Sequence, residues 1–399
     1  MSYAYLLSGA RTPIGKLLGA LSSLTAPELG AIVIRAALQR ANVEPAAVDE
    51  VIMGNVLSAG LGQAPARQAA LKAGLPPTVA ALTINKMCGS GLKAVMLADQ
   101  AIRAGDARCI VAGGMESMSR APHLLTGVRE GWKYGHQQAV DSMIRDGLWC
   151  AFENVSMGAE ADYIAQLCEV SRGDQDAFAV ESHRRALAAI EAGKFQAEIA
   201  PVTIAGRKGN TIVERDEGPR ADTNLAGLAA LKPAFEQQAD VATRTVTAGN
   251  ASQISDGAAA LIVGDKQLAA AHPSPLTARI VASATSGVPP REIFIAPVAA
   301  MQSCLSKAGL TIDDIDLVEI NEAFAAQVLA GMKPLGLTSE RVNVYGGAIA
   351  LGHPIGASGA RVLVTLLHAL ADRNLKRGLV SLCLGGGNAV AMIVERVEF

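Results

Sequence analysis

Residues 80–95 read AALTINKMCGSGLKAV and place a predicted strand directly before a predicted helix. Ala80–Ile84 is typical of a strand, and Gly89–Arg103 is typical of a helix that Gly105 ends. A second apolar run, Cys109–Ala112, follows and predicts another buried strand. Strands that alternate with helices in this way predict an α/β sheet with helices on its faces.

The same alternation continues on both sides of this stretch. Thr25 is a suitable N-cap for a helix whose apolar residues recur at helical spacing. We expect strands at 4–7, 48–56 and 258–263, helices at 27–40 and 63–73, and a buried pair of strands joined by a glycine turn within 379–394.

The chain also contains an internal repeat. Three pairs of segments match in the same order and at nearly the same separation along the chain. They are 49–55 with 316–322, 89–95 with 357–362, and 111–114 with 383–386. A repeat of this length predicts two like domains rather than a solenoid.

The region between about 120 and 249 differs from the rest. It holds most of the aromatic residues, including both tryptophans, and helices are expected at 156–168 and 174–192, with a polar loop at 207–224. We therefore predict a first half made of residues 1–119 and 250–272. An inserted domain at 120–249 interrupts it, and a second half follows at 273–399.

Composition excludes several classes of protein. The 35 basic and 37 acidic residues give a net charge of −2, which argues against a nucleic-acid-binding protein. No uninterrupted apolar run is long enough for a membrane span, and the N-terminal residues lack the basic region and apolar stretch that are typical of a signal peptide. Six cysteines without a Cys-x-x-Cys pair predict free thiols in the cytoplasm. Low charge and high apolar content predict a homo-oligomer.

Cys88 lies at the apex of the turn between the strand and the helix described first. A helix N-terminus offers free backbone N–H groups and a partial positive charge, which stabilise a thiolate. We therefore expect Cys88 to have a lowered pKa and to be nucleophilic. The alternative is a small buried core residue, and the residues alone leave both open.

Three further residues carry candidate chemistry. His353, in a glycine-rich loop, is a general base, an oxyanion donor or an ordinary loop histidine. Asn321, after a buried strand, places a water or a ligand carbonyl, or is only a helix N-cap. Cys383 ends an apolar strand before three glycines, where backbone N–H groups can meet an oxyanion, or is a core cysteine.

The internal repeat places the Cys88 turn and the His353 loop at equivalent positions of the two halves. Two halves that face each other would bring all four side chains together. Two thiols, an imidazole and an amide favour acyl transfer through a covalent thioester. No ligand pair at short spacing suggests a metal site, so no metal is expected.

The motifs in this order resemble the thiolase family over essentially the whole chain. They are 85–94, 112–117 (AGGMES), 247–252 (TAGNAS), 256–259, 321–324 (NEAF), 346–359 and 383–387 (CLGGG). The resemblance implies an α/β fold of two duplicated βαβαβαββ halves in a five-layered α/β/α/β/α arrangement. It also implies that the insertion is a loop domain that holds coenzyme A.

The resemblance also implies roles for the candidate residues. Cys88 is the acylated nucleophile, His353 its activating base, and Cys383 the acid and base for the acetyl carbon. Asn321 holds a water that forms one oxyanion hole with His353. The backbone N–H groups of Cys88 and Gly385 form the other.

Coenzyme A is implied as substrate and product, and no cofactor is expected to stay bound. The reaction is reversible thiolysis of a 3-ketoacyl-CoA, or condensation of two acetyl-CoA, in a dimer or a tetramer built as a dimer of dimers. The implied coenzyme A contacts are Leu148, Met157, Arg220, Phe235, Ala248 and Ser252.

The sequence departs from the family pattern in three places. Ser156 stands where short-chain members have histidine, and Gly227 stands at a common serine. Ile293-Phe294 stands where many members have Met-Gly. We expect acetoacetyl-CoA to be accepted and the acyl range to extend to about six carbons.

Other classes of function fit less well. A cysteine hydrolase leaves Cys383 without a role, and a ketoacyl synthase lacks a second cysteine of this kind. A scaffold without activity is favoured only if Cys88 is unreactive. A dinucleotide-dependent oxidoreductase would need a G-x-G-x-x-G motif after a strand, and none is found.

Overall fold

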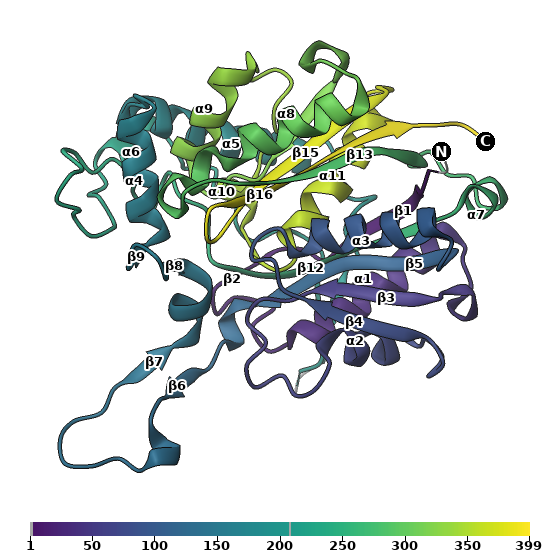
Figure 1. The fold of residues 1–399 in the computed structure, drawn as a ribbon, viewed down its shortest axis with the longest axis horizontal. Helices are drawn as coiled ribbons and strands as arrows, with labels where there is room; N and C mark the ends of the chain where they lie inside the picture. Colours follow the sequence, from purple (N-terminus) through teal and green to yellow (C-terminus); the bar gives the residue numbers. More distant parts are fainter. Residues whose placement is uncertain (1–2, 207–208) are drawn as a thin grey trace.

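The computed structural model describes residues 3–206 and 209–399 and has a large mixed sheet at its centre (Figure 1). Its strands are β1 (Tyr5–Arg11), β2 (Gly15–Lys16), β3 (Glu50–Gly54), β4 (Ala80–Ile84), β5 (Cys109–Ser117), β12 (Ser255–Gly264), β13 (Ala278–Gly287), β14 (Leu317–Ile320), β15 (Arg377–Leu384) and β16 (Asn388–Arg396). The order across the sheet is β14-β15-β16-β13-β1-β12-β5-β3-β4, with β2 beside β12.

The two halves of the chain have the same strand order. In the first half, β4, β3 and β5 are parallel, and β12 and β1 follow antiparallel. In the second half, β14 and β15 are parallel, β16 and β13 follow antiparallel, and a parallel bridge from Val342 to Val318 takes the place of β4. The predicted duplication is therefore confirmed. The halves join where Tyr5 and Leu6 pair with the start of β13.

Helices pack on and between the two halves of this sheet and form the helical layers of the fold. They are α1 (Ala26–Ala41), α2 (Pro65–Ala73), α3 (Ser90–Ala104), α8 (Ala296–Ala308), α9 (Ala325–Met332), α10 (Ala348–Leu351) and α11 (Ser358–Asp372). One apolar core joins α1 and α2 to the first half, another joins α8 and α9 to the second half, and a third packs α3 and α11 between the halves. The result is the expected five-layered α/β/α/β/α fold.

Local sequence sets the ends of these helices. Thr25 caps α1 through a reciprocal capping box in which its N–H donates to Glu28 at 2.9 Å. Asn42, with φ of 52°, ends the same helix in the left-handed region that asparagine tolerates. Gly74 and Gly105 end α2 and α3 in the same way, as their positions in the sequence predict.

Helices α3 and α11 meet through two glycines at their N-terminal ends. A Cβ on Gly91 would lie 2.7 Å from the backbone N of Ala360, and one on Gly359 would lie 2.4 Å from the backbone N of Leu92. No other residue allows so close an approach. The contact places the turn before α3 and the loop before α11 next to each other, at the centre of the molecule.

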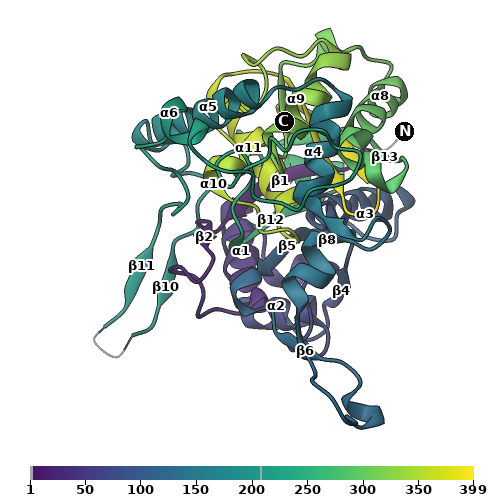
Figure 2. The same cartoon turned by 90° about the vertical axis from the view of Figure 1, so that its left-hand side faces the viewer.

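The segment between β5 and β12 carries its own helices and hairpins. These are β6 (His123–Leu125), β7 (Ala139–Asp141), β8 (Trp149–Cys150), β9 (Val155–Ser156), α4 (Met157–Leu167), α5 (Arg172–Glu191), β10 (Val202–Ile204), β11 (Thr211–Val213) and α6 (Leu225–Ala229). The β6–β7 and β10–β11 segments project from the rest of the chain (Figure 2).

The expectation of a loop at 207–224 is wrong in part. Thr211–Val213 forms β11 because it pairs antiparallel with Val202–Ile204, a partner that local sequence does not reveal. Residues 207–208 lie outside the described part of the chain. No helix of the described residues is both long enough and apolar enough to span a bilayer.

Candidate active site

Cys88 lies in a strained turn between β4 and α3. Met87 has a φ of 48°, in the left-handed region that methionine rarely adopts. Asn85 Oδ1 accepts the Met87 N–H at 2.9 Å, and Ser90 Oγ accepts the Lys86 N–H at 2.8 Å. Ser90 also donates to the Met87 carbonyl at 2.6 Å. These bonds hold the cysteine just before Gly89, the N-cap of α3.

The expectation of a lowered pKa for Cys88 is wrong for the free protein. Burial raises the pKa of the Cys88 thiol to about 12, and the negative charge of Glu116 acts in the same direction. The N–H groups of Cys88 and Gly385 lower this pKa only in part. The neighbours that exclude water come from distant parts of the sequence, so the local turn does not reveal them. A neutral thiol needs a base before it can attack.

His353 is a neutral imidazole beside this thiol. Burial, together with the positive charge of Arg361, lowers its pKa to about 3. Ser358 Oγ donates to the Pro354 carbonyl at 2.9 Å and lies 2.6 Å from His353 Nδ1. Because the hydroxyl has one proton and gives it to the carbonyl, it accepts from Nδ1–H. His353 Nε2 then carries the free lone pair of a base.

Asn321 follows β14 and faces the imidazole. Its Nδ2 lies 3.4 Å from His353 Nε2 and 3.5 Å from Nδ1. The N-cap of α9 is Phe324, so Asn321 is not explained as a helix cap. Its Oδ1 is buried and has no hydrogen-bond partner among the described residues. An unpaired buried acceptor of this kind is suited to a water or a ligand.

Cys383 lies near the end of β15, opposite Cys88. Burial and the neighbouring Cys88 raise the pKa of its thiol well above the ordinary value. Gly386 and Gly387, with φ of 86° and 82°, make the turn into β16 that only glycine adopts easily. This turn directs the Gly385 N–H to the Cys88 sulfur.

These side chains surround one small cavity of about 50 Å³. Its wall includes Cys88, His353, Cys383 and Gly385, while Asn321 lies behind the imidazole. The remaining lining residues are mostly apolar. They are Gly147, Leu148, Met157, Ser252, Ile293, Phe294, Ala323, Phe324 and Ile355.

The residues expected to contact coenzyme A separate into two groups. Leu148, Met157 and Ser252 line this cavity. Phe235 lies close by, with its ring edge-on to Phe324 at 6.0 Å and against Gly158. Arg220 and Ala248 are exposed and lie outside the cavity wall. The Arg220 N–H donates to His183 Nδ1 at 3.1 Å.

The departures from the family pattern have clear structural places. Ser156 is the N-cap of α4 and donates to Glu236 at 2.9 Å, which holds the segment that carries Phe235. Phe294 is 2% exposed, lines the cavity and packs edge-on to Phe324 at 5.2 Å. Gly227 is exposed, and its N–H donates to the Asn224 cap of α6.

Sequence reasoning assigned no role to three buried residues that support the site. Ser358 orients His353. Glu116 and Glu322 each accept several hydrogen bonds from loops around the cavity. Both glutamates lie within motifs that resemble the thiolase family, and this position was the one sequence feature that pointed to them. Their partners are distant in sequence, so the motifs could not assign them a role.

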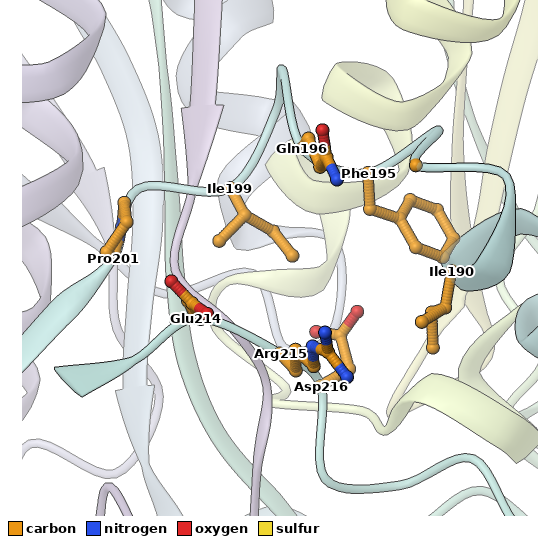
Figure 3. A pocket seen from close by; sticks show the side chains of 9 residues that line it. Ile190, Phe195, Gln196, Ile199, Pro201, Glu214, Arg215 and Asp216 are labelled. Atoms are coloured by element: carbon orange, nitrogen blue, oxygen red, sulfur yellow. The ribbon is translucent and has the colours of Figure 1, made fainter.

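A larger cavity of about 320 Å³ lies at the base of the β10–β11 hairpin (Figure 3). Its wall includes Phe195, Gln196, Glu214 and Asp216 but none of the four candidate residues. Asp216 is bound at both oxygens by the buried Arg11. The small cavity is therefore the better site for acyl chemistry. No group of three potential metal ligands occurs within the described residues.

Comparisons with known proteins identify relatives along the full length of the chain. The family described as "Thiolase, N-terminal domain" matches residues 4–267, and "Thiolase, C-terminal domain" matches residues 274–396. An acetyl-CoA acetyltransferase of Escherichia coli strain K12 is 53% identical over 399 residues, which is 100% of both chains. One from Cupriavidus necator is 52% identical over 99% of this chain and 100% of its own.

The fold agrees with these relationships. The crystal structure of the Bacillus anthracis acetyl-CoA acetyltransferase superimposes with a TM-score of 0.96 at 41% identity. The match covers 100% of this chain and 99% of the other. On its sequence, its duplicated halves and its fold, the chain belongs to the thiolase family.

Proposed function

We propose that the protein is an acetyl-CoA acetyltransferase. It condenses two acetyl-CoA to acetoacetyl-CoA and coenzyme A, and it also runs the reverse thiolysis. Relatives with this name span the whole chain at about half identity. The observation that carries the proposal is the small cavity with two thiols, Cys88 and Cys383, and the neutral His353 in its wall.

The first half-reaction acylates Cys88. His353 Nε2 takes the thiol proton as the sulfur attacks the acetyl-CoA carbonyl, so that no free thiolate of high pKa has to accumulate. The N–H groups of Cys88 and Gly385 already point at this sulfur and are placed to stabilise the developing oxyanion. Coenzyme A then leaves with the proton that His353 held, and acetyl-Cys88 remains.

The second half-reaction forms the carbon–carbon bond. His353 Nε2 first takes the proton of the Cys383 thiol, and the Cys383 thiolate then removes a proton from the methyl group of a second acetyl-CoA. The enolate oxygen is stabilised by Asn321 and by the N–H that His353 Nε2 now carries. The enolate carbon attacks acetyl-Cys88, and the bond between the acetyl carbon and sulfur breaks. The methyl proton stays on Cys383, and the proton held by His353 passes to the departing Cys88 sulfur, so both thiols and the imidazole end neutral.

Coenzyme A is bound as substrate and product, with no cofactor held permanently. In this proposal, residues 1–119 and 250–272 form one half, 273–399 the other, and the inserted 120–249 the coenzyme A-binding domain. Contacts to coenzyme A come from Leu148, Met157, Arg220, Phe235, Ala248 and Ser252. The proximity of three of these to the thiols supports the assignment.

The acyl group is expected to be short. Phe294 lies in the cavity wall and does not point away from it. With Phe324 it leaves a space of about 50 Å³, where one water needs roughly 10–15 Å³. This favours two-carbon acyl groups over the broader range that the sequence left open.

We also propose a homo-oligomer in the cytoplasm. Strand β4 is an open edge of the sheet, with Leu82 exposed, and is available to pair with a second copy. The β6–β7 segment projects with Trp132 and Tyr134 exposed, which supplies a second surface for a dimer of dimers.

A kinetic comparison of three proteins tests the proposed function. The native enzyme should consume acetoacetyl-CoA only when coenzyme A is present, and Cys88→Ser should abolish this activity. Cys383→Ser should lose condensation but keep exchange of acetyl groups between acetyl-CoA and free coenzyme A. Equal loss of exchange in both variants would contradict the separate roles. Absence of thiolysis in the native enzyme would refute the function.

A further inference from the structure

Glu116 is a completely buried carboxylate that the proposed mechanism does not use. It lies near the end of β5, and its two oxygens accept four hydrogen bonds. Oε1 accepts from Asn55 Nδ2 at 2.8 Å and the Leu57 N–H at 3.1 Å. Oε2 accepts from the Val56 N–H at 3.0 Å and the Gly356 N–H at 2.9 Å.

The donors come from both halves of the molecule. Residues 55–57 follow β3 in the first half, whereas Gly356 belongs to the loop that carries His353 in the second. The fit is tight, because a Cβ on Gly356 would lie 2.7 Å from Glu116 Oε2 and 2.9 Å from the Met115 carbonyl. Glu116 therefore ties the His353 loop to the first half, which also carries Cys88.

The tie lies directly behind the catalytic cavity. Val56, Leu57 and Ile355 form one apolar cluster that packs against Met87 and Cys88. Ile355 also lines the cavity itself. A shift of the His353 loop would therefore change the spacing between imidazole and thiol, on which proton transfer depends.

The charge of Glu116 acts on the same thiol. No lysine, arginine or histidine side chain donates a hydrogen bond to Glu116 in the part of the chain that the structure describes. The titratable groups around it are Asp256 on β12 and Cys88. Burial raises the pKa of Glu116 to about 7, and its negative charge raises the pKa of Cys88.

We propose that Glu116 is a positioning residue for the Cys88–His353 pair. Its hydrogen bonds hold the His353 loop against the Cys88 turn and so fix the spacing between the imidazole and the thiol. The inference rests on the proposed function for the identity of the reacting pair.

The test compares Glu116→Gln with a matched control, Asp99→Asn. Glutamine keeps the size of the side chain but removes the charge. Its NH2 group cannot accept the two hydrogen bonds that one carboxylate oxygen of Glu116 accepts. Asp99 is a buried carboxylate on α3 that pairs with Arg103 and lies outside the cavity. The measurements are kcat and KM for acetyl-CoA, and the pH dependence of Cys88 alkylation by iodoacetamide.

For Glu116→Gln, kcat should fall about 10- to 100-fold, as for other residues that orient a reacting side chain. The KM for acetyl-CoA should stay within about twofold, because the substrate does not touch Glu116. The apparent pKa of Cys88 alkylation should move down, since a negative neighbour is lost. The control should change neither kcat nor this pKa.

Two outcomes would overturn the inference. One is a folded Glu116→Gln protein with native kcat and a native Cys88 titration. The other is an equal loss in both variants, which would mark a purely structural role. If Glu116→Gln does not fold, Gly356→Ala keeps the charge but places a Cβ 2.7 Å from Glu116 Oε2, which pushes the His353 loop away from the carboxylate. It should then lower kcat without moving the Cys88 titration, and a native kcat would refute the tie.

Failure of the proposed function gives a different result. In that case the native enzyme itself would show no acetyl transfer, and Cys88 would not be protected from alkylation by acetyl-CoA. If the native enzyme is active but Glu116→Gln changes neither kcat nor the Cys88 titration, only the inference about Glu116 is rejected.

Discussion

Phe294 is expected to limit the length of the acyl chain, and its replacement by alanine should relax that limit. The ring is 2% exposed, packs edge-on to Phe324 at 5.2 Å and forms part of the wall of the cavity. Alanine removes the whole ring, which occupies more space than two methylene groups. A six-carbon 3-ketoacyl-CoA needs room for two methylenes more than acetoacetyl-CoA.

The size of the effect follows from burial of those methylenes. Each buried methylene contributes about 0.8 kcal/mol, so two contribute about 1.6 kcal/mol. Since 1.4 kcal/mol is a factor of ten, the ratio of kcat/KM for the six-carbon over the four-carbon substrate should rise about 14-fold. The variant should also lose about 3–5 kcal/mol of folding free energy, as buried Phe→Ala changes do.

The assay is thiolysis of 3-ketoacyl-CoA substrates of four, six and eight carbons, below the unfolding temperature of each variant. Phe195→Ala is the matched control, because Phe195 is a buried ring beneath Arg11 and borders the other cavity (Figure 3). It should lose similar stability without a change in the substrate ratio. A folded Phe294→Ala enzyme with a ratio within twofold of native would show that Phe294 does not limit the acyl chain, as would an equal rise in the control.

Three further results are expected. Asn321→Ala should lower kcat for condensation about 10²- to 10³-fold, the usual cost of one oxyanion donor, and a loss below fivefold would contradict its role. Gly359→Ala should cost about 1–3 kcal/mol in urea unfolding because its Cβ meets Leu92 N at 2.4 Å. Gly331→Ala, with open space around it in α9, should raise the free energy of unfolding by about 0.5–1 kcal/mol. Equal changes in this free energy for the two variants would argue against the close contact between α3 and α11. Burial lowers the folded-state pKa of His353 to about 3, so the unfolded chain binds more protons from there up to about pH 6.5. Relative to His353→Gln, the free energy of unfolding of the native protein should fall by up to about 1.4 kcal/mol per pH unit as pH drops from 6.5 to 4.5. If plots of this free energy against pH run parallel for the two proteins, the imidazole is not buried in its neutral form.

The sequence predicted the parts of the fold that depend on local pattern. Strand β4 and the end of α3 at Gly105 agree with the expected positions. The matched segments around Val51 and Val318 lie at equivalent places in the two halves. Periodicity and glycine positions are local properties of the sequence, and the internal repeat shows the same pattern in each half.

The remaining features depend on contacts between distant segments. Strand β5 continues past Ala112 to Ser117 because β12 pairs with its whole length. The pKa of Cys88 rises because residues of both halves bury the turn. The direction of the Phe294 ring is set by Phe324. None of these partners can be identified from the segment that contains the residue.

In the proposed reaction Cys88 carries the acyl group during turnover. Intact-protein mass spectrometry after brief incubation with acetoacetyl-CoA, followed by peptide mapping, tests it most directly. One added acetyl group, about 42 Da, is expected on Cys88 of the native protein and of Cys383→Ser, and none on Cys88→Ser. An acetyl group on any other residue, or its persistence in Cys88→Ser, would contradict the role of Cys88 as the acylated nucleophile.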